Sequence, residues 1–259
     1  MKYHIIGINK VGINTYNFLK KKKQIVTISD IKNNKYKKKD FYYNGHPKKL
    51  INQSNKLIYC PGVIRSEDEY NKYLLKNKAI SELEIFYKFK NWPKKNILFV
   101  TGSRGKSSVC NLILKKLRKL KLFEKIFYLD RKRYTFSNLP IYKKGYFLVA
   151  EVDYQTFLVG KCLKAEYRIF TSYFKKENKA FKSDYLYFKA KLKIFNNLDK
   201  NSVIIINKKT LKKIKIKLNK FKNRFLLVKN KRSTQDNNSI LCDTILNQIK
   251  KNEKYKLFK

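Results

Sequence analysis

Hydrophobic residues at the start of the chain fall into short runs separated by polar segments. Three of these runs predict strands: YHIIGI (3–8), QIVTISD (24–30) and KLIYCPGV (56–63). Between the first two, apolar residues recur with helical spacing from Val11 to Leu19 and predict a helix. A strand, a glycine turn, a helix and a second strand that ends in an acidic residue form the beginning of a nucleotide-binding α/β unit.

The pattern changes near the end of this first part. The segment EDEYNKYLLKNKAISELEIFYKF (67–89) predicts a helix, and the stretch NWPKKN (91–96) then interrupts the periodicity. We place a domain boundary there, which gives units of residues 1–92 and 93–259.

The second unit begins with the strand ILFVT (97–101), followed by a glycine-containing loop and a helix over 107–120. Further strands are predicted at GYFLVAEV (145–152), YRIFTSY (167–173), SVIIIN (202–207) and RFLLV (224–228), and further helices at 183–198 and 237–251. Strands that alternate with helices favour parallel sheets. The expected fold class is therefore α/β, with two consecutive units that each carry a mostly parallel sheet.

The loop VTGSRGKSSVC (100–110) carries the most specific chemical pattern in the chain. Its glycines, Gly102 and Gly105, allow backbone N–H groups to turn toward an anion, and the helix that follows adds a partial positive charge. Lys106 can neutralise phosphate charge, and the Ser107 hydroxyl can bind Mg²⁺. The spacing is shorter than the general G-x-x-x-x-G-K-[ST] pattern. A chain with only eight glycines favours a phosphate loop here over a structural turn.

The turn GINKVG (7–12) is a weaker signal. It keeps Gly7 and Gly12, but Asn9 stands where the middle glycine of G-x-G-x-x-G belongs.

The charge balance is strongly basic. The chain has 63 Lys and Arg against 18 Asp and Glu, a formal charge of +45, which attracts polyanions. The lysines are spread from residue 2 to residue 259, and Asn, Ile, Tyr and Phe are inflated with them, as AT-rich codons would produce. We favour that compositional explanation and expect no specific nucleic-acid partner, with a polyanion-binding basic protein as the weakest alternative.

The cysteines and the apolar runs point to the cellular compartment. Cys60, Cys110, Cys162 and Cys242 lie far apart without a C-x-x-C pair, which favours reduced thiols over a zinc site. No apolar run approaches the ~20 residues of a membrane span, and the amino-terminal run is too short for a signal peptide. We expect a soluble cytoplasmic protein.

The loop TGSRGKSS after a strand resembles the shortened ATP loop of the Mur ligases, cytoplasmic enzymes that build the peptidoglycan stem peptide. Other segments most resemble the D-glutamate-adding members of that family: GINKVG (7–12), Ser29-Asp30, CPGV (60–63), ELEIF (82–86), SNLP (137–140), EVDYQ (151–155) and YFKAKLKIF (187–195). The resemblance covers nearly the whole chain, and its segments follow the family's order.

The resemblance implies a division of labour between the two units. A Rossmann-like N-terminal domain would hold the UDP part of the substrate through Gly7, Gly12, Asp30, Pro61 and Gly62. A central ATPase domain of P-loop type would bind the ATP phosphates through Gly102, Ser103, Arg104, Gly105, Lys106, Ser107 and Ser108.

The resemblance also implies a catalytic centre. Lys106 would be the charge partner of the phosphates, and Asn138 falls where the family contacts its muramoyl substrate. Mg²⁺ would be held by Ser107, Glu151 and Lys191, the last as a carbamylated lysine. The implied reaction is an ATP-dependent, ADP-forming ligation that joins D-glutamate to UDP-N-acetylmuramoyl-L-alanine through an acyl phosphate.

Structural explanations stand beside three of these roles. Asp30 can simply terminate a strand, and Lys191 can lie on a solvated helix face. Glu151 follows a buried apolar run, where an unpaired carboxylate is costly, so we favour a metal or phosphate role for it.

Two departures from the family pattern put catalysis in question. Lys175 and Lys176 stand where the family has an Asp-His pair whose His binds a second metal, and two cations there would repel Mg²⁺. Arg104 replaces an Asn of the loop. The chain also ends about where the central domain should end, so we expect the C-terminal ligase domain to be absent or supplied by a separate chain. The alternative is a nucleotide- or UDP-sugar-binding remnant without catalysis.

Overall fold

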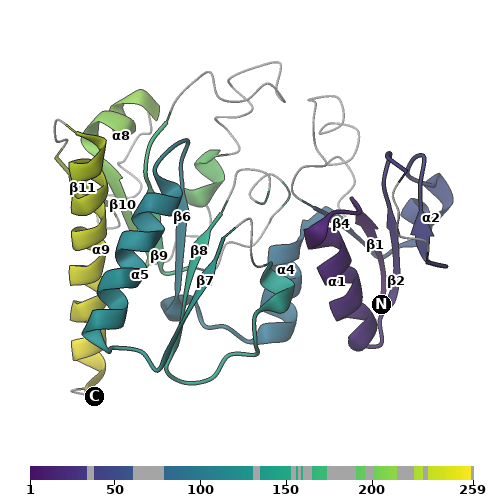
Figure 1. The fold of residues 1–259 in the computed structure, drawn as a ribbon, viewed down its shortest axis with the longest axis horizontal. Helices are drawn as coiled ribbons and strands as arrows, with labels where there is room; N and C mark the ends of the chain where they lie inside the picture. Colours follow the sequence, from purple (N-terminus) through teal and green to yellow (C-terminus); the bar gives the residue numbers. More distant parts are fainter. Residues whose placement is uncertain are drawn as a thin grey trace.

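The computed structural model describes residues 1–33, 38–60, 79–130, 135–152, 156, 159, 165–173, 191–195, 201–214, 225–229 and 233–257. Within these ranges the strands form two β-sheets in which each strand runs parallel to its neighbours. The first sheet lies at the right of Figure 1 and the second lies toward the left, with helix α4 between them.

The first sheet has the strand order β3-β2-β1-β4-β5. Its strands are β1 (Lys2–Ile6), β2 (Ile25–Ser29), β3 (Phe41–Tyr42), β4 (Lys56–Tyr59) and β5 (Ala79–Ser81). The helices of this part are α1 (Lys10–Lys21), α2 (Lys48–Gln53) and α4 (Glu82–Lys90). Because β1 is the central strand, the turn that follows it lies between the ends of β2 and β4.

The second sheet has the order β11-β10-β9-β6-β8-β7. Its strands are β6 (Ile97–Thr101), β7 (Lys125–Leu129), β8 (Tyr146–Glu151), β9 (Tyr167–Phe170), β10 (Val203–Asn207) and β11 (Phe225–Val228). Its helices are α5 (Lys106–Leu120), α8 (Lys208–Ile214) and α9 (Thr234–Leu257), with short 3₁₀ turns at Lys94–Asn96, Phe136–Asn138 and Lys193–Phe195. After β6 the chain forms β7 and β8 on one side of β6, and it then crosses to form β9 on the other side. The end of β6 is thus the point where the strand order reverses, which is where open α/β sheets bind ligands.

One face of the second sheet is covered by α5 and α9, which lie side by side in Figure 1. In α5 the buried residues Val109, Ile113 and Leu117 recur every four positions, and α9 repeats this spacing with residues such as Leu241 and Ile245. This spacing places the apolar side chains of each helix on one stripe. Each fully buried side chain of this size contributes about 1.5–3 kcal/mol, which holds both helices against the sheet.

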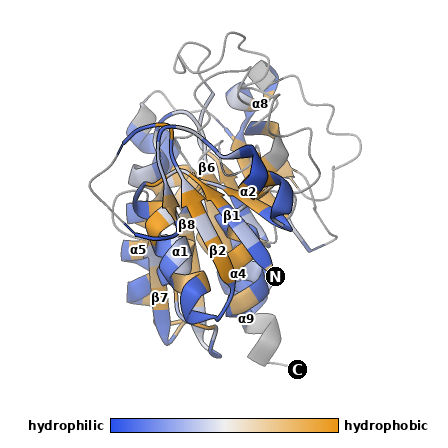
Figure 2. Cartoon of the chain, turned by 90° about the vertical axis from the view of Figure 1, so that its right-hand side faces the viewer, coloured by the Kyte–Doolittle hydropathy of each residue, from blue (hydrophilic) through white to orange (hydrophobic). Residues whose placement is uncertain are grey.

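The other face of the second sheet packs on α4. The Phe86 ring of α4 lies 6.0 Å from that of Trp92 and 5.2 Å from that of Phe136. The same hydrophobic cluster extends from Tyr59 of the first sheet to Phe99 of the second. Figure 2 shows the hydrophobic residues concentrated on the strands, with hydrophilic residues on helices such as α2. Since one cluster spans both sheets, the division at residues 92 and 93 stays a prediction.

The structure confirms the α/β class with parallel sheets, and it corrects one predicted element. The helix expected over 67–89 is wrong at its described end, because Ala79–Ser81 form β5 and α4 begins at Glu82. The reason is local: Ser81 caps the helix, and its backbone N–H donates to the Glu84 carboxylate at 2.9 Å in a capping box. The expectation also missed β3, β7, α2 and α8, and it ended the closing helix α9 too early.

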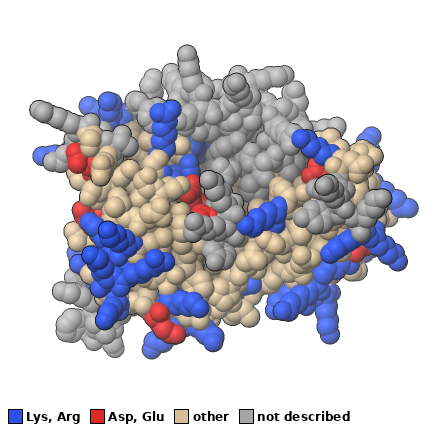
Figure 3. All heavy atoms as spheres, viewed as in Figure 1, with Lys and Arg blue, Asp and Glu red and all other residues tan. Residues whose placement is uncertain are grey.

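The surface is basic over both units. In Figure 3 the Lys and Arg side chains are distributed across the visible face, with few acidic side chains among them. Three cysteines, Cys60, Cys110 and Cys242, are buried free thiols, and burial raises the pKa of each. Among the helices that the structure describes, none is long and apolar enough to cross a bilayer.

Candidate functional site

The predicted phosphate loop lies at the carboxyl end of β6, between β8 and β9. Thr101 ends the strand, and α5 begins at Lys106. Gly102 and Gly105 have φ angles of 141° and 84°, a backbone region that side chains strongly disfavour. At Gly102 a Cβ atom would also lie 2.1 Å from the Thr171 hydroxyl. Both glycines are therefore required by the shape of the loop.

Helix α5 begins without a side-chain cap. Its N-cap residue is Gly105, and its first turn contains no acidic residue. The backbone N–H groups of a helix N-terminus carry a partial positive charge, and they bind anions where no side chain caps them. This end of α5 is therefore suited to an anionic ligand.

Lys106, the first residue of α5, folds back over the loop. Its ammonium group donates to the carbonyl oxygens of Gly102 at 3.0 Å and of Ser103 at 3.4 Å. These carbonyls hold a positive charge next to the helix N-terminus, where it can neutralise a phosphate.

Two of the three residues expected to bind Mg²⁺, Ser107 and Glu151, lie in contact. The Ser107 hydroxyl donates to Glu151 Oε2 at 2.7 Å. Glu151 ends β8 and pairs with Val100 near the end of β6, so its side chain lies beside the start of α5, where Ser107 is the second residue. Glu151 is only 8% exposed. Burial raises the pKa of nearby Tyr128, and the charge of Glu151 raises it further.

This donor pair fits Mg²⁺. The ion prefers oxygen ligands and is commonly held by one or two carboxylates together with substrate phosphates and water. Ser107 offers a hydroxyl and Glu151 a carboxylate. In the ranges described, no group of three or more His, Cys, Asp and Glu side chains could hold a metal ion, so ligands of another kind would have to complete the coordination.

Two residues that hold the phosphate loop in place, Thr171 and Ser172, were not selected in the sequence analysis. The Thr171 hydroxyl donates to the Arg104 carbonyl at 2.6 Å, and the Ser172 hydroxyl donates to the same oxygen at 2.9 Å. The Ser103 backbone N–H donates to the Ser172 carbonyl at 2.8 Å. Both residues follow β9, the parallel neighbour of β6. The sequence analysis placed both residues inside the predicted strand 167–173, whereas β9 ends at Phe170 and its carboxyl end lies beside that of β6.

The opening turn brings Gly7, Gly12 and Asp30 together. A Cβ atom at Gly12 would lie 2.0 Å from the Gly7 carbonyl oxygen, so glycine allows α1 to pack closely against the end of β1. The Asp30 carboxylate accepts the backbone N–H groups of Ile8 at 2.8 Å and Lys32 at 3.1 Å. Asp30 therefore stabilises the turn after β1. The sequence analysis had set a structural explanation, the end of a strand, beside its proposed substrate contact.

Asn138 lies where the two units meet. Its side-chain oxygen accepts a hydrogen bond from Asn14 of α1 at 2.9 Å. The neighbouring Ser137 donates to buried Glu82 from its hydroxyl at 2.7 Å and from its backbone at 2.8 Å. Burial raises the pKa of Glu82, while the hydrogen bonds from Ser137 oppose that shift. Asn14 and Glu82 are further residues of this junction that sequence reasoning did not select.

The remaining predicted residues lie in other segments of the chain. Lys191 is 3% exposed and precedes a 3₁₀ turn at Lys193–Phe195, so the solvated helix face considered for it is wrong. Arg168 of β9 fixes this segment by donating to the Ile194 carbonyl. Pro61 and Gly62, together with the lysines at 175 and 176, lie outside the described residues.

Comparisons with known proteins show which enzymes this chain resembles. No protein-family model matches the chain. The chain is 24% identical over 228 residues to the UDP-N-acetylmuramoylalanine–D-glutamate ligase of Caldicellulosiruptor saccharolyticus, which covers 80% of this chain and 48% of that protein. The enzyme of the same name from Coxiella burnetii is 27% identical over 119 residues, 42% of this chain and 26% of that protein. The chain is similar in sequence to these D-glutamate ligases over up to 80% of its length.

A solved Mur ligase structure shares the fold. The UDP-N-acetylmuramate:L-alanyl-gamma-D-glutamyl-meso-diaminopimelate ligase from Neisseria meningitides aligns with 88% of this chain and 77% of that chain, with a TM-score of 0.51 and 14% sequence identity. This likeness concerns the fold alone. The chain spans about half the length of the Caldicellulosiruptor ligase.

Proposed function

We propose that this chain binds ATP on the loop between β6 and α5 and acts as an ADP-forming ligase of peptidoglycan precursor synthesis. The substrates proposed are UDP-N-acetylmuramoyl-L-alanine and D-glutamate, in line with the names of the relatives. The observation that carries the proposal is the 2.7 Å contact of Ser107 with Glu151 at the uncapped start of α5. It combines an anion site with a pair of Mg²⁺-type oxygen donors.

The loop residues would bind and orient the triphosphate. The backbone N–H groups at the start of α5 would donate to phosphate oxygens, and Lys106 would exchange its contacts with the Gly102 and Ser103 carbonyls for phosphate contacts. Such preorganised positive groups stabilise charge that develops on a transferring phosphoryl group.

Ser107 and Glu151 would hold Mg²⁺ beside these phosphates. Bound Mg²⁺ would supply neutralisation of phosphate charge and polarisation of a phosphoryl oxygen. Lys191 would contribute as a carbamate, which converts a buried cation into a carboxylate-like ligand. A buried unmodified lysine beside a metal would be repelled by it, which gives the carbamate a physical reason.

The first unit would hold the UDP-linked substrate near the turn after β1. In the proposed reaction a carboxylate oxygen of UDP-N-acetylmuramoyl-L-alanine attacks the γ-phosphorus of ATP and ADP leaves. The amine of D-glutamate then attacks the acyl carbon, the phosphate leaves, and the amine releases a proton.

The test is phosphate release that depends on both substrates. We expect inorganic phosphate to appear only when ATP, UDP-N-acetylmuramoyl-L-alanine and D-glutamate are all present. Glu151→Gln should lower its rate by about 100-fold, because the variant removes a carboxylate ligand and its charge. Asp243→Asn is the matched control, since Asp243 is a half-exposed acid of α9 that pairs with Lys116.

Other outcomes discriminate between the candidates. Phosphate release that continues without D-glutamate, or that is unchanged in Glu151→Gln, would contradict the proposed ligase. ATP binding without any phosphate release would instead support the second candidate, a nucleotide-binding protein without catalysis. Lys175 and Lys176, at the positions of the family's Asp-His pair, are the observation that favours this second candidate.

A further inference from the structure

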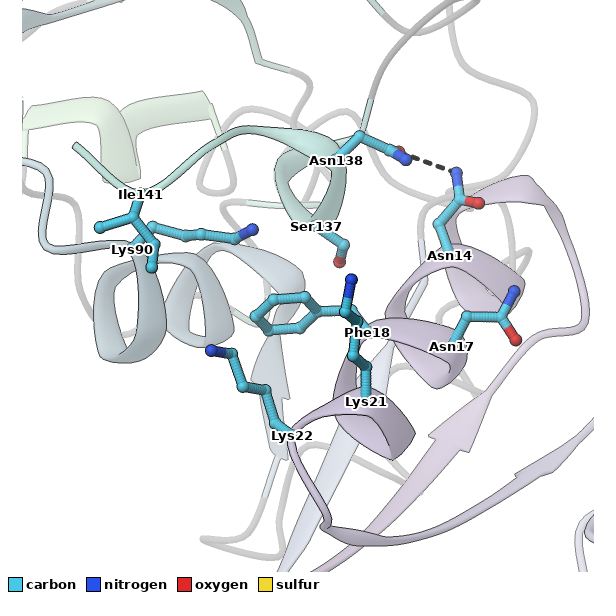
Figure 4. Close-up of a pocket in the computed structure, with 9 residues that line it drawn as sticks. All are labelled: Asn14, Asn17, Phe18, Lys21, Lys22, Lys90, Ser137, Asn138 and Ile141. Carbon is cyan, nitrogen blue, oxygen red and sulfur yellow. Dashed lines mark hydrogen bonds between the residues drawn. The ribbon is translucent and has the colours of Figure 1, made fainter. Parts of the chain in front are cut away.

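A second basic site lies away from the phosphate loop, where the two units meet. A cavity of about 540 Å³ opens between α1, α4 and the segment 137–141. Figure 4 shows the side chains of Lys21, Lys22 and Lys90 around the Phe18 ring at this place. The described residues that line the cavity include these three lysines and no acidic residue.

Lys90 is the unusual member of this group. It is only 7% exposed, and its ammonium lies 4.2 Å from the centroid of the Phe18 ring. Within the described part of the chain, that ring is its only direct partner. Burial lowers the pKa of Lys90, and the charges of Lys22 and Lys21 lower it further, while Glu82 opposes them. Three lysines line the cavity and none of its described lining residues is acidic, so the cavity carries a net positive charge.

The other walls of the cavity favour an organic ligand. The polar lining residues are Asn14, Asn17, Ser137 and Asn138. The Asn14 amide donates to Asn138, and the Ser137 hydroxyl donates to Glu82. Phe18 and Ile141 provide apolar contact surface. The volume falls within the range of about 300–1,000 Å³ that is typical of small-molecule sites, and it is larger than a single phosphate requires.

We propose that this cavity binds a small phosphorylated metabolite, with its phosphate groups on Lys21, Lys22 and Lys90. Lysine ammonium groups bind phosphate as compact point charges, and the amides and the Phe18 ring would contact the organic part. Because α1 follows β1 while Ser137 belongs to the segment between β7 and β8, the ligand would connect the two units. The site does not depend on the activity proposed for the β6–α5 loop.

The probe for this site is radiolabelled inorganic pyrophosphate, measured by equilibrium dialysis at physiological ionic strength. The parent protein is Lys106→Met, which weakens the phosphate loop and leaves the cavity intact. We expect saturable binding by this protein. Adding Lys90→Met should weaken binding by about tenfold or more, since contacts with charged groups are worth about 1.5–3 kcal/mol.

Two further variants make the result decisive. Lys22→Met removes an exposed cavity lysine, so it tests the site without disturbing the core, and we expect a similar loss. Lys115→Met is the matched control, because Lys115 is an exposed lysine of α5 outside the cavity. Equal binding by the Lys22, Lys90 and Lys115 variants would overturn the proposal, and so would the absence of binding by Lys106→Met alone.

Discussion

The chain begins each of its two sheets with a strand, a glycine turn and a helix, and the two helices begin in different ways. In the first, Asn9 caps α1 by accepting the Gly12 N–H at 3.0 Å, and Asp30 accepts the Ile8 N–H at 2.8 Å. In the second, α5 begins at Gly105 without a side-chain cap. Side chains accept backbone N–H groups of the first turn. No side chain caps the N-terminus of α5, so its backbone N–H groups can bind an anionic ligand.

The glycines show the same contrast. Gly12 lets α1 approach the Gly7 carbonyl, which is a contact within one unit. Gly102 lets the loop pass under Thr171 of the neighbouring strand end. The first glycine therefore serves packing, and the second shapes a binding loop. Related architecture alone does not distinguish the two turns. The absence of a side-chain cap on α5 makes the second turn the candidate phosphate site.

The largest expected effect comes from Gly102→Ala. The substitution combines an unfavourable φ with a Cβ atom 2.1 Å from the Thr171 hydroxyl, so we expect the free energy of unfolding to fall by roughly 4 kcal/mol. ATP affinity should be lost as well, because the loop must change shape. Urea unfolding and ATP titration under native conditions measure the two quantities.

Gly12→Ala is the counterpart in the first turn. Its Cβ atom would meet the Gly7 carbonyl at 2.0 Å, which should lower the free energy of unfolding by roughly 2 kcal/mol. The ATP affinity of the folded protein should not change. A Gly12→Ala protein that folds normally and loses ATP would contradict the separate roles given to the two turns.

The first unit should also be the acid-sensitive one. His4 is fully buried, with its ring nitrogens 2.7 Å from the Thr27 hydroxyl and 2.8 Å from the Ser29 hydroxyl. Burial, followed by the charge of His46, lowers its pKa from 6.5 to about 4. The unfolded chain therefore binds more protons between these two values, and stability falls as the pH drops from 6.5 toward 4.

The loss expected from His4 over this pH range is on the order of 3 kcal/mol. Urea unfolding at several pH values should show a flatter pH dependence for His4→Gln than for the unsubstituted protein. Glu82, whose pKa is raised, changes stability in the opposite direction but does so in both proteins. Parallel pH profiles of the two proteins would show that His4 is not responsible.

The smallest expected effect is that of Asn9→Ala. Loss of the cap should lower the free energy of unfolding by about 1 kcal/mol, because the Gly12 N–H loses its side-chain acceptor. ATP affinity should stay the same, since α1 does not bind the nucleotide. Thermal unfolding and ATP titration test both statements, and weaker ATP binding would argue against the contrast between the helices.

Much of this fold could be predicted from local patterns. The run ILFVT and the helix after it were found because buried parallel strands and amphipathic helices leave periodic signals. The strand β7 was missed because KIFYL is short and follows a lysine-rich helix end. The strand β5 was missed because Ala79–Ser81 precede a helix whose pattern continues backward through them.

The site could be predicted only where its residues lie on one motif or resemble a known family. Ser107 and Glu151 were paired in this way, and the structure brings them together at 2.7 Å. Thr171 and Ser172 were missed because their role depends on the pairing of β6 with β9, which the sequence does not state. The same holds for Lys90, whose burial depends on the packing of α4 against α1.

The most direct test of the contrast between the turns is ATP affinity in two matched variants. Lys10 and Lys106 are both the first residue of their helices. Isothermal titration calorimetry of ATP should show a loss of about 10- to 100-fold for Lys106→Met and no change for Lys10→Met. Equal affinities of the two variants, or a loss confined to Lys10→Met, would contradict the assignment of the phosphate site to the uncapped helix.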